Sequence, residues 1–195
     1  GLEQGQPISE NFAYCAPDGL GKTKDAGNVN PAIHWQGAPA NTKSFALIMV
    51  DGDVPASFET ANQDGKIIPN DFPRQNFYHW VLADIPANVT QIDEGADSKA
   101  VIKGGKKPGK MAYGVNGQND YARAFGGDAN SWGGYDGPCP PWNDERLHHY
   151  RFIVYALDVV SVGVSGAFRG QTLETAMKGH ILAQGEVMGT YTNKK

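Results

Sequence analysis

The sequence predicts a mainly β fold, and three observations carry this prediction. Three segments have the composition and periodicity of β-strands, at 44–55, 77–85 and 148–159. Only one segment, at 172–181, has apolar residues at convincing helical spacing. The chain also holds 25 glycines and 12 prolines, which is typical of a fold with many turns. We expect residues 1–195 to form a single domain.

Composition excludes several classes of protein. With 19% charged and 40% hydrophobic residues, the chain is globular and not disordered. Its formal net charge of −4 offers no basic footprint for nucleic acid. The longest apolar run, 45–50, is far too short to cross a bilayer, so we expect no transmembrane segment.

The first 43 residues carry weak signals. Residues 11–15 are consistent with a short edge strand, and 18–30 have the composition of a loop. Residues 32–35 suggest another short strand, after the turn at Asn30-Pro31.

The segment 44–55 (SFALIMVDGDVP) indicates a strand that is buried on both faces. Side chains alternate between the faces of a strand, so the same period places Asp51 and Asp53 together on one face. Two carboxylates leaving an apolar strand need partners or water. The alternative is an ordinary polar turn, because Asp, Gly and Pro are common turn residues.

The next strand, 77–85 (FYHWVLADI), places His79 on the face of Phe77 and Val81, opposite Trp80. Long polar segments flank it at 56–76 and 87–110, and 111–147 is an irregular region of glycines and aromatics. Aromatic residues on such loops can form the wall of a ligand pocket or simply pack on the sheet.

The strand at 148–159 (HHYRFIVYALDV) has the strongest β signal. It places His148 and Tyr150 on one face, and His149 and Arg151 on the other. A helix then follows with Thr172 as a plausible N-cap, and Gly185 precedes a last strand near 186–191.

Three motifs together resemble the phosphatidylethanolamine-binding protein family, also called the Raf kinase inhibitor protein family. They are DGDVP at 51–55, HW at 79–80, and GPCPP followed by LHHYRF between 137 and 152. The tail GHILAQGEVMGTY at 179–191 is similar to the bacterial branch. The family motif more often has Asp-Pro-Asp-Ala-Pro, so this chain differs at Gly52 and Val54 but keeps both acids.

The resemblance implies two antiparallel sheets in a Greek-key-like sandwich, with a few peripheral helices and a small anion pocket. By matched position, the pocket residues are Asp51, Asp53, His79, Gly137, His148 and Tyr150. The implied ligand is a small anion or a phospholipid headgroup. The family name also implies regulation of a protein partner such as a kinase or a protease. No cofactor and no metal are implied.

An anion pocket that contains two carboxylates needs a physical explanation. Carboxylates fit if they accept from histidine Nδ1–H and hold imidazolium rings whose other N–H faces the ligand. Backbone N–H groups near Gly137 and the hydroxyl of Tyr150 are further candidate donors.

Two other classes of function stay open. A hydrolase could use the Asp and His side chains for acid–base chemistry, or Cys139 as a nucleophile beside His148. Against a hydrolase, the sequence has no Gly-x-Ser-x-Gly motif. A zinc site could use Asp51, Asp53, His79 and His148, but their spacing matches no compact metal motif.

The resemblance implies two covalent features. We expect a cis peptide bond between Val54 and Pro55, since X–Pro is the one peptide bond for which cis costs little. We also expect Cys15 and Cys139 to form a disulfide; the alternative is two unrelated buried cysteines. A disulfide favours an oxidising compartment, so we expect the periplasm, with the cytoplasm as the alternative.

Overall fold

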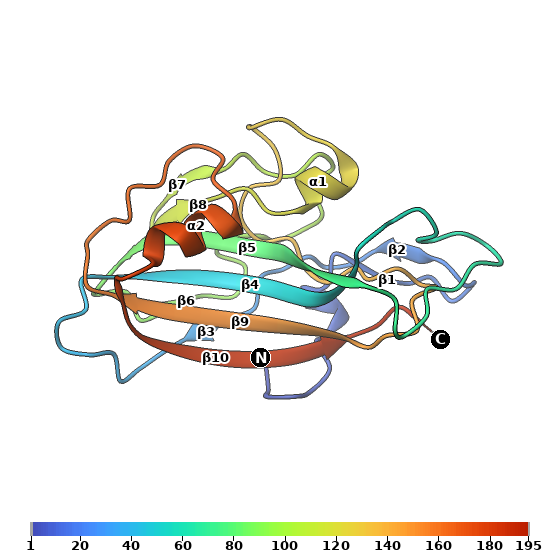
Figure 1. Ribbon diagram of the computed structural model, residues 1–195, viewed down its shortest axis with the longest axis horizontal. Helices are drawn as coiled ribbons and strands as arrows, with labels where there is room; N and C mark the ends of the chain where they lie inside the picture. Colours follow the sequence, from blue (N-terminus) through green and yellow to red (C-terminus); the bar gives the residue numbers. More distant parts are fainter. Residues whose placement is uncertain (1, 195) are drawn as a thin grey trace.

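The computed structural model describes residues 2–194 and is built on a six-stranded antiparallel sheet (Figure 1). The strand order is β10-β9-β4-β5-β8-β7. These strands are β4 (Ser44–Pro55), β5 (Arg74–Pro86), β7 (Gly109–Met111), β8 (Gly114–Asn116), β9 (His148–Leu157) and β10 (Ile181–Tyr191). Two small antiparallel pairs join β1 (Cys15–Pro17) to β2 (Thr23–Asp25), and β3 (Ile33–His34) to β6 (Gln91–Ile92). The predicted mainly β fold with antiparallel sheets is confirmed.

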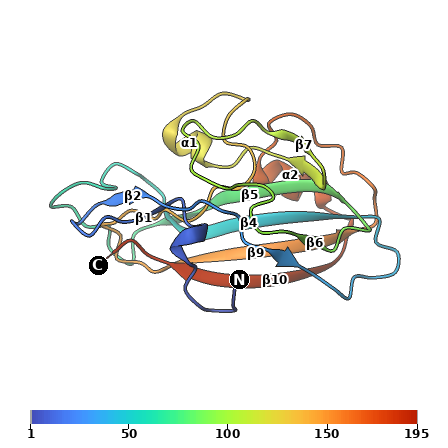
Figure 2. The ribbon, with the colours of Figure 1, turned by 180° about the vertical axis from the view of Figure 1, so that it is seen from behind.

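The helices are short and peripheral. They are the 3₁₀ turn η1 (Glu10–Phe12), α1 (Tyr121–Phe125) and α2 (Gly170–Met177). Helix α2 covers one face of the large sheet, while β3 and the N-terminal segment lie over the other face (Figures 1 and 2). None of the helices within residues 2–194 has the length and apolar character needed to cross a membrane.

Each face of β4 contributes to a separate apolar core. Leu47 and Met49 pack with Phe152 of β9 and with the β3–β6 pair, whereas Ala46 and Ile48 pack with α2. All four β4 side chains are completely buried. The predicted alternation of this strand is therefore correct up to Asp51, and a strand buried on both faces holds the start of the site rigidly.

Irregular pairing between β4 and β5 changes which residues face the site. Asp51 pairs with Phe77 and Val54 with Gln75, so two residues of β4 stand opposite one of β5. A second irregularity leaves His79 unpaired between Tyr78 and Trp80. A β-bulge inserts one residue and thereby reverses the alternation beyond it. This explains why Trp80, and not Val81, continues along the face on which His79 lies.

The expected cis bond before Pro55 is wrong, because no peptide bond within residues 2–194 is cis. The prediction assumed that the chain must turn sharply after the two acids. Instead β4 continues through Pro55, which pairs with Arg74, and the bulge between Asp51 and Val54 supplies the change of direction.

The predicted bounds at the C-terminal end also need correction. Thr172 lies inside α2, which begins at Gly170 and ends at Met177. Gly179 has φ of 84° and ends the helical path, since glycine adopts this left-handed conformation without strain. Strand β10 then begins at Ile181, so Gly185 lies within the strand and does not precede it.

Candidate functional site

A cavity of about 210 Å³ lies where β4, β5 and β9 meet α1 and two loops. We call it the His79 cavity. Its floor carries four polar side chains, namely Asp51, His79, His148 and Tyr150. Its walls are mostly apolar and come from Val54, Phe58, Ala61, Asn62, Phe77, Tyr121, Ala124, Phe125, Cys139, Pro140 and Pro141. The structure thus brings together four of the six predicted pocket residues.

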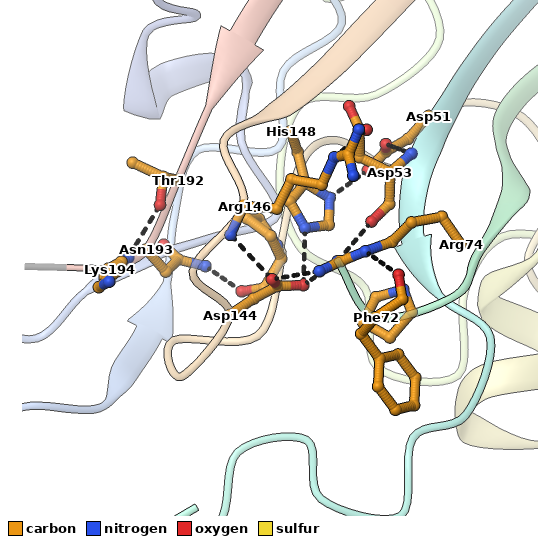
Figure 3. A network of polar contacts seen from close by, with 12 residues as sticks. Asp51, Asp53, Phe72, Arg74, Asp144, Arg146, His148, Thr192, Asn193 and Lys194 are labelled. Atoms are coloured by element: carbon orange, nitrogen blue, oxygen red, sulfur yellow. Dashed lines mark hydrogen bonds and ion pairs between the residues drawn. The ribbon is translucent and has the colours of Figure 1, made fainter. Parts of the chain in front are cut away.

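His148 is held between two carboxylates (Figure 3). Its Nδ1 lies 2.6 Å from Oδ2 of Asp51, and its Nε2 lies 3.1 Å from Oδ2 of Asp144. Arg74 completes the chain by donating to both carboxylate oxygens of Asp144, at 2.6 and 3.0 Å. All of these side chains except Arg74 are almost fully buried, and Arg74 itself is only 9% exposed.

This arrangement makes His148 a buried cation. Burial opposes the charged ring, but the adjacent carboxylates of Asp51 and Asp144 outweigh burial and raise the pKa of His148 to about 9. Asp144 also benefits: despite burial, hydrogen bonds from His148 and Arg74 lower its pKa. In this chain of four groups each carboxylate has a cation beside it, so the floor of the cavity carries no uncompensated negative charge.

His79 supplies the floor with an unpaired acceptor. Its Nδ1 lies 2.8 Å from the main-chain oxygen of Asp136, and a carbonyl oxygen can only accept, so Nδ1 carries a hydrogen. Its Nε2 is buried and has no hydrogen-bond partner. Burial, more than any nearby charge, lowers the pKa of His79, which leaves the ring neutral at pH 7. Nε2 therefore presents a lone pair.

Two tyrosines line the cavity, Tyr121 and Tyr150. Burial, together with the nearby carboxylate of Asp51, raises the pKa of Tyr150 well above the usual range, so its hydroxyl keeps its hydrogen. Tyr121 donates to the main-chain oxygen of Gly137 at 2.7 Å. In both cases the oxygen atom keeps lone pairs that can accept from a ligand.

Asp53 does not contribute to the cavity, contrary to the prediction. Its carboxylate accepts from Nδ1 of His149 at 2.8 Å and from Nε of Arg146 at 2.7 Å. The bulge after Asp51 turns Asp53 away and places Val54 in the cavity wall instead. The two acids therefore bind two different histidines, one on each face of β9.

Gly137 also lies outside the cavity lining. Its N–H donates to Oδ1 of Asn28 at 2.8 Å and is not free for a ligand. A Cβ built on Gly137 would stand 2.0 Å from the main-chain oxygen of Phe12, which is closer than real contacts allow. This glycine is required for the close packing of two chain segments.

Cys15 and Cys139 form the predicted disulfide, with Cα atoms 5.0 Å apart. Cys139 lines the cavity, so the bridge fixes the 137–141 loop to β1 at the edge of the site. Because the sulfur is bonded, Cys139 has no thiol to act as a nucleophile.

Asp144 and Arg74 are not among the site residues that the sequence predicts. Asp144 precedes His148 by four residues in a segment that looked like an ordinary loop, and Arg74 begins a strand that we expected to start at Phe77. The sequence shows only that each is a charged residue close to the end of a strand. Charge alone does not identify His148 as the group that they bind. Among residues 2–194, no group of three or more His, Cys, Asp or Glu side chains is arranged to hold a metal ion.

The amino-acid sequence matches a known protein family. The sequence model described as phosphatidylethanolamine-binding protein matches residues 2–192. The chain belongs to the phosphatidylethanolamine-binding protein family. Curated relatives carry the name UPF0098 protein. The one from Chlamydia muridarum is 33% identical over 186 residues, which are 95% of this chain and 97% of the relative. The chain spans 66% of the length of a Pyrococcus horikoshii relative, which is 33% identical over 167 residues.

Solved structures of family members have the same fold. Escherichia coli YbcL, described as a member of the mammalian family, superposes with a TM-score of 0.70 and 24% identity, covering 98% of this chain and 93% of YbcL. The homologue CT736 from Chlamydia trachomatis superposes with a TM-score of 0.64 and 27% identity, covering 97% and 92%. Membership of the phosphatidylethanolamine-binding family supports small-ligand binding.

Proposed function

We propose that this chain is a binding protein that takes a small phosphate-bearing ligand, such as a phospholipid headgroup, into the His79 cavity. The observation that carries the proposal is that His79 lines the cavity and that its buried Nε2 has no hydrogen-bond partner. Buried polar atoms in native proteins are nearly always hydrogen-bonded, so an unpaired one on a residue that lines a cavity is a candidate contact for a ligand. The family description supports the phosphate headgroup as the class of ligand.

The electrostatics of the floor are compatible with an anion. The charge of Asp51 is balanced by protonated His148, and that of Asp144 by Arg74. An anion therefore meets a carboxylate whose field is largely cancelled at short range. The apolar walls exclude water from the floor, which strengthens each remaining hydrogen bond.

Catalysis has less support than binding. A hydrolase that used His148 as a base would need a free ring nitrogen, but both nitrogens contact carboxylates. A thiol route is closed while Cys139 is in the disulfide. These observations favour a binding protein over the alternative hydrolase. Regulation of a kinase or protease partner stays a prediction from the family resemblance.

We also propose an oxidising compartment, the periplasm, as the location. The support is the Cys15–Cys139 bridge, because structural disulfides persist where thiols are not kept reduced.

Calorimetric titration with phosphoethanolamine tests the proposed function. We expect binding to the wild-type protein, and an affinity roughly tenfold or more weaker in His79→Phe, which keeps a ring but removes Nε2. His149→Ala is the matched control, because His149 pairs with Asp53 outside the cavity. The proposal fails if phosphoethanolamine does not bind, or if His79→Phe and His149→Ala bind it as wild type does.

A further inference from the structure

The polar atoms on the floor of the His79 cavity are almost all hydrogen-bond acceptors. His148 is the one cation among the described lining residues, and both of its ring nitrogens already contact carboxylates. Nε2 of His79 carries no hydrogen and has no hydrogen-bond partner. Such a floor offers an incoming oxygen atom many lone pairs and few hydrogens.

The Asp51 carboxylate keeps some capacity to accept. Oδ2 accepts from His148 at 2.6 Å, and Oδ1 accepts from the N–H of Asp53 at 2.7 Å. A carboxylate has about four lone-pair sites, so about two remain. Asn62 at the mouth uses its Oδ1 to accept from Trp142, which leaves its NH₂ group as a neutral donor.

We propose that the His79 cavity selects oxyanions that carry a hydrogen atom, namely phosphomonoester or phosphonate monoanions, over oxyanions of the same shape that carry none, such as sulfate esters. The inference rests on the proposed function and names its class of ligand. The P–O–H group of a monoanion donates to Asp51 or to Nε2 of His79. A sulfate ester in the same place has no hydrogen to donate, so its oxygen lone pairs face the lone pairs of Asp51 and of Nε2 of His79 and repel them.

Protonation of the site follows from the groups around His79. These are Asp51 on β4, His148 and Tyr150 on β9, Asp120 and Tyr121 at α1, and the main-chain oxygen of Asp136. Burial lowers the pKa of His79 by more than the nearby carboxylates raise it, so the ring is neutral. A phosphomonoester loses its second hydrogen with a pKa of about 6, so its affinity should fall as pH rises above that value.

The test compares two ligands that differ in one hydrogen. Phosphoethanolamine and 2-aminoethyl hydrogen sulfate have the same amine and nearly the same shape. Each is titrated into the wild-type protein by calorimetry at about pH 5.5, where the phosphomonoester is mainly the monoanion. We expect phosphoethanolamine to bind at least roughly tenfold more tightly, since a hydrogen bond to a charged group contributes on that scale. We also expect the preference to shrink in Asp51→Asn, whose amide can donate to sulfate, and to persist in His149→Ala.

Each outcome has a definite meaning. Equal affinity of the wild-type protein for the two ligands would overturn the selection while leaving phosphate binding intact. Binding of neither ligand would overturn the proposed function and the selection together. If Asp51→Asn does not fold, the comparison of the two ligands on the wild-type protein still decides the matter.

Discussion

Oδ2 of Asp144 lies 3.1 Å from Nε2 of His148, which is the ring nitrogen that does not contact Asp51. This contact decides what the histidine can do. With both nitrogens bound to carboxylates, His148 acts as a buried counter-charge and does not donate to a ligand. In the proposed function, direct contact with the ligand then depends on His79 and Asp51.

Loss of Asp144 should destabilise the fold. Asp144→Ala leaves Arg74 and His148 without their shared carboxylate, and breaking a buried ion pair from one side costs about 3–5 kcal/mol of unfolding free energy. Glu145→Ala is the control, because its pairing with Lys194 is solvent-exposed and such pairs contribute at most about 1 kcal/mol. Urea denaturation measures both variants, and equal midpoints would contradict the buried network.

His148 should make stability depend on pH in the alkaline range. Its folded pKa of about 9 lies above the unfolded value of about 6.5, so its contribution is complete below pH 6.5 and is lost as pH rises through 9. We expect the loss to total about 3 kcal/mol at most. Urea denaturation at pH 6.5, 7.5, 8.5 and 9.5 measures this loss. The slope should flatten in His148→Gln; an unchanged slope would show that another group titrates.

The disulfide should contribute to both stability and binding. Cys15 and Cys139 are 124 residues apart, and closing a loop of that length stabilises by about 4–5 kcal/mol in the chain-entropy model. We expect a reductant to lower the guanidinium midpoint and to weaken ligand affinity, because Cys139 lines the cavity. The Cys15→Ala/Cys139→Ala double variant should not respond to the reductant. A response there would mean that the reductant acts elsewhere.

Gly137 should prove structural. Gly137→Ala places a Cβ against the main chain of Phe12, so we expect it to lower thermal stability strongly. Gly185→Ala is a matched control, because nothing lies within 4 Å of the Cβ that it adds. If Gly137→Ala melted like wild type but lost ligand, the glycine would belong to the binding site after all.

Sequence periodicity was sufficient for the parts of the site on regular strands. Alternation correctly placed His148 and Tyr150 on one face of β9, with His149 on the other. It failed after Asp51 and after His79 because a separate bulge at each point adds one residue and reverses the pattern, and no residue type marks these insertions. Asp144 could not be identified as a partner because it comes from a loop whose path is set by tertiary contacts.

The family resemblance was right about the fold and the disulfide but wrong about the cis bond at Pro55. It also named Gly137 as a ligand contact, whereas the structure uses its N–H to bind Asn28. A residue that matches the family motif can therefore have a different hydrogen-bond partner in this chain. Its role has to be established from its own hydrogen bonds.

The most direct test of the central claim is the protonation of His79 on ligand binding. In protein labelled with ¹⁵N-histidine, NMR distinguishes a bare ring nitrogen from one that carries or shares a hydrogen, and His79→Phe identifies the signal. At pH 7 we expect Nε2 of His79 to be bare in the free protein and to shift toward the protonated range as phosphoethanolamine is added. An Nε2 signal that stays unchanged while calorimetry shows binding would contradict the account.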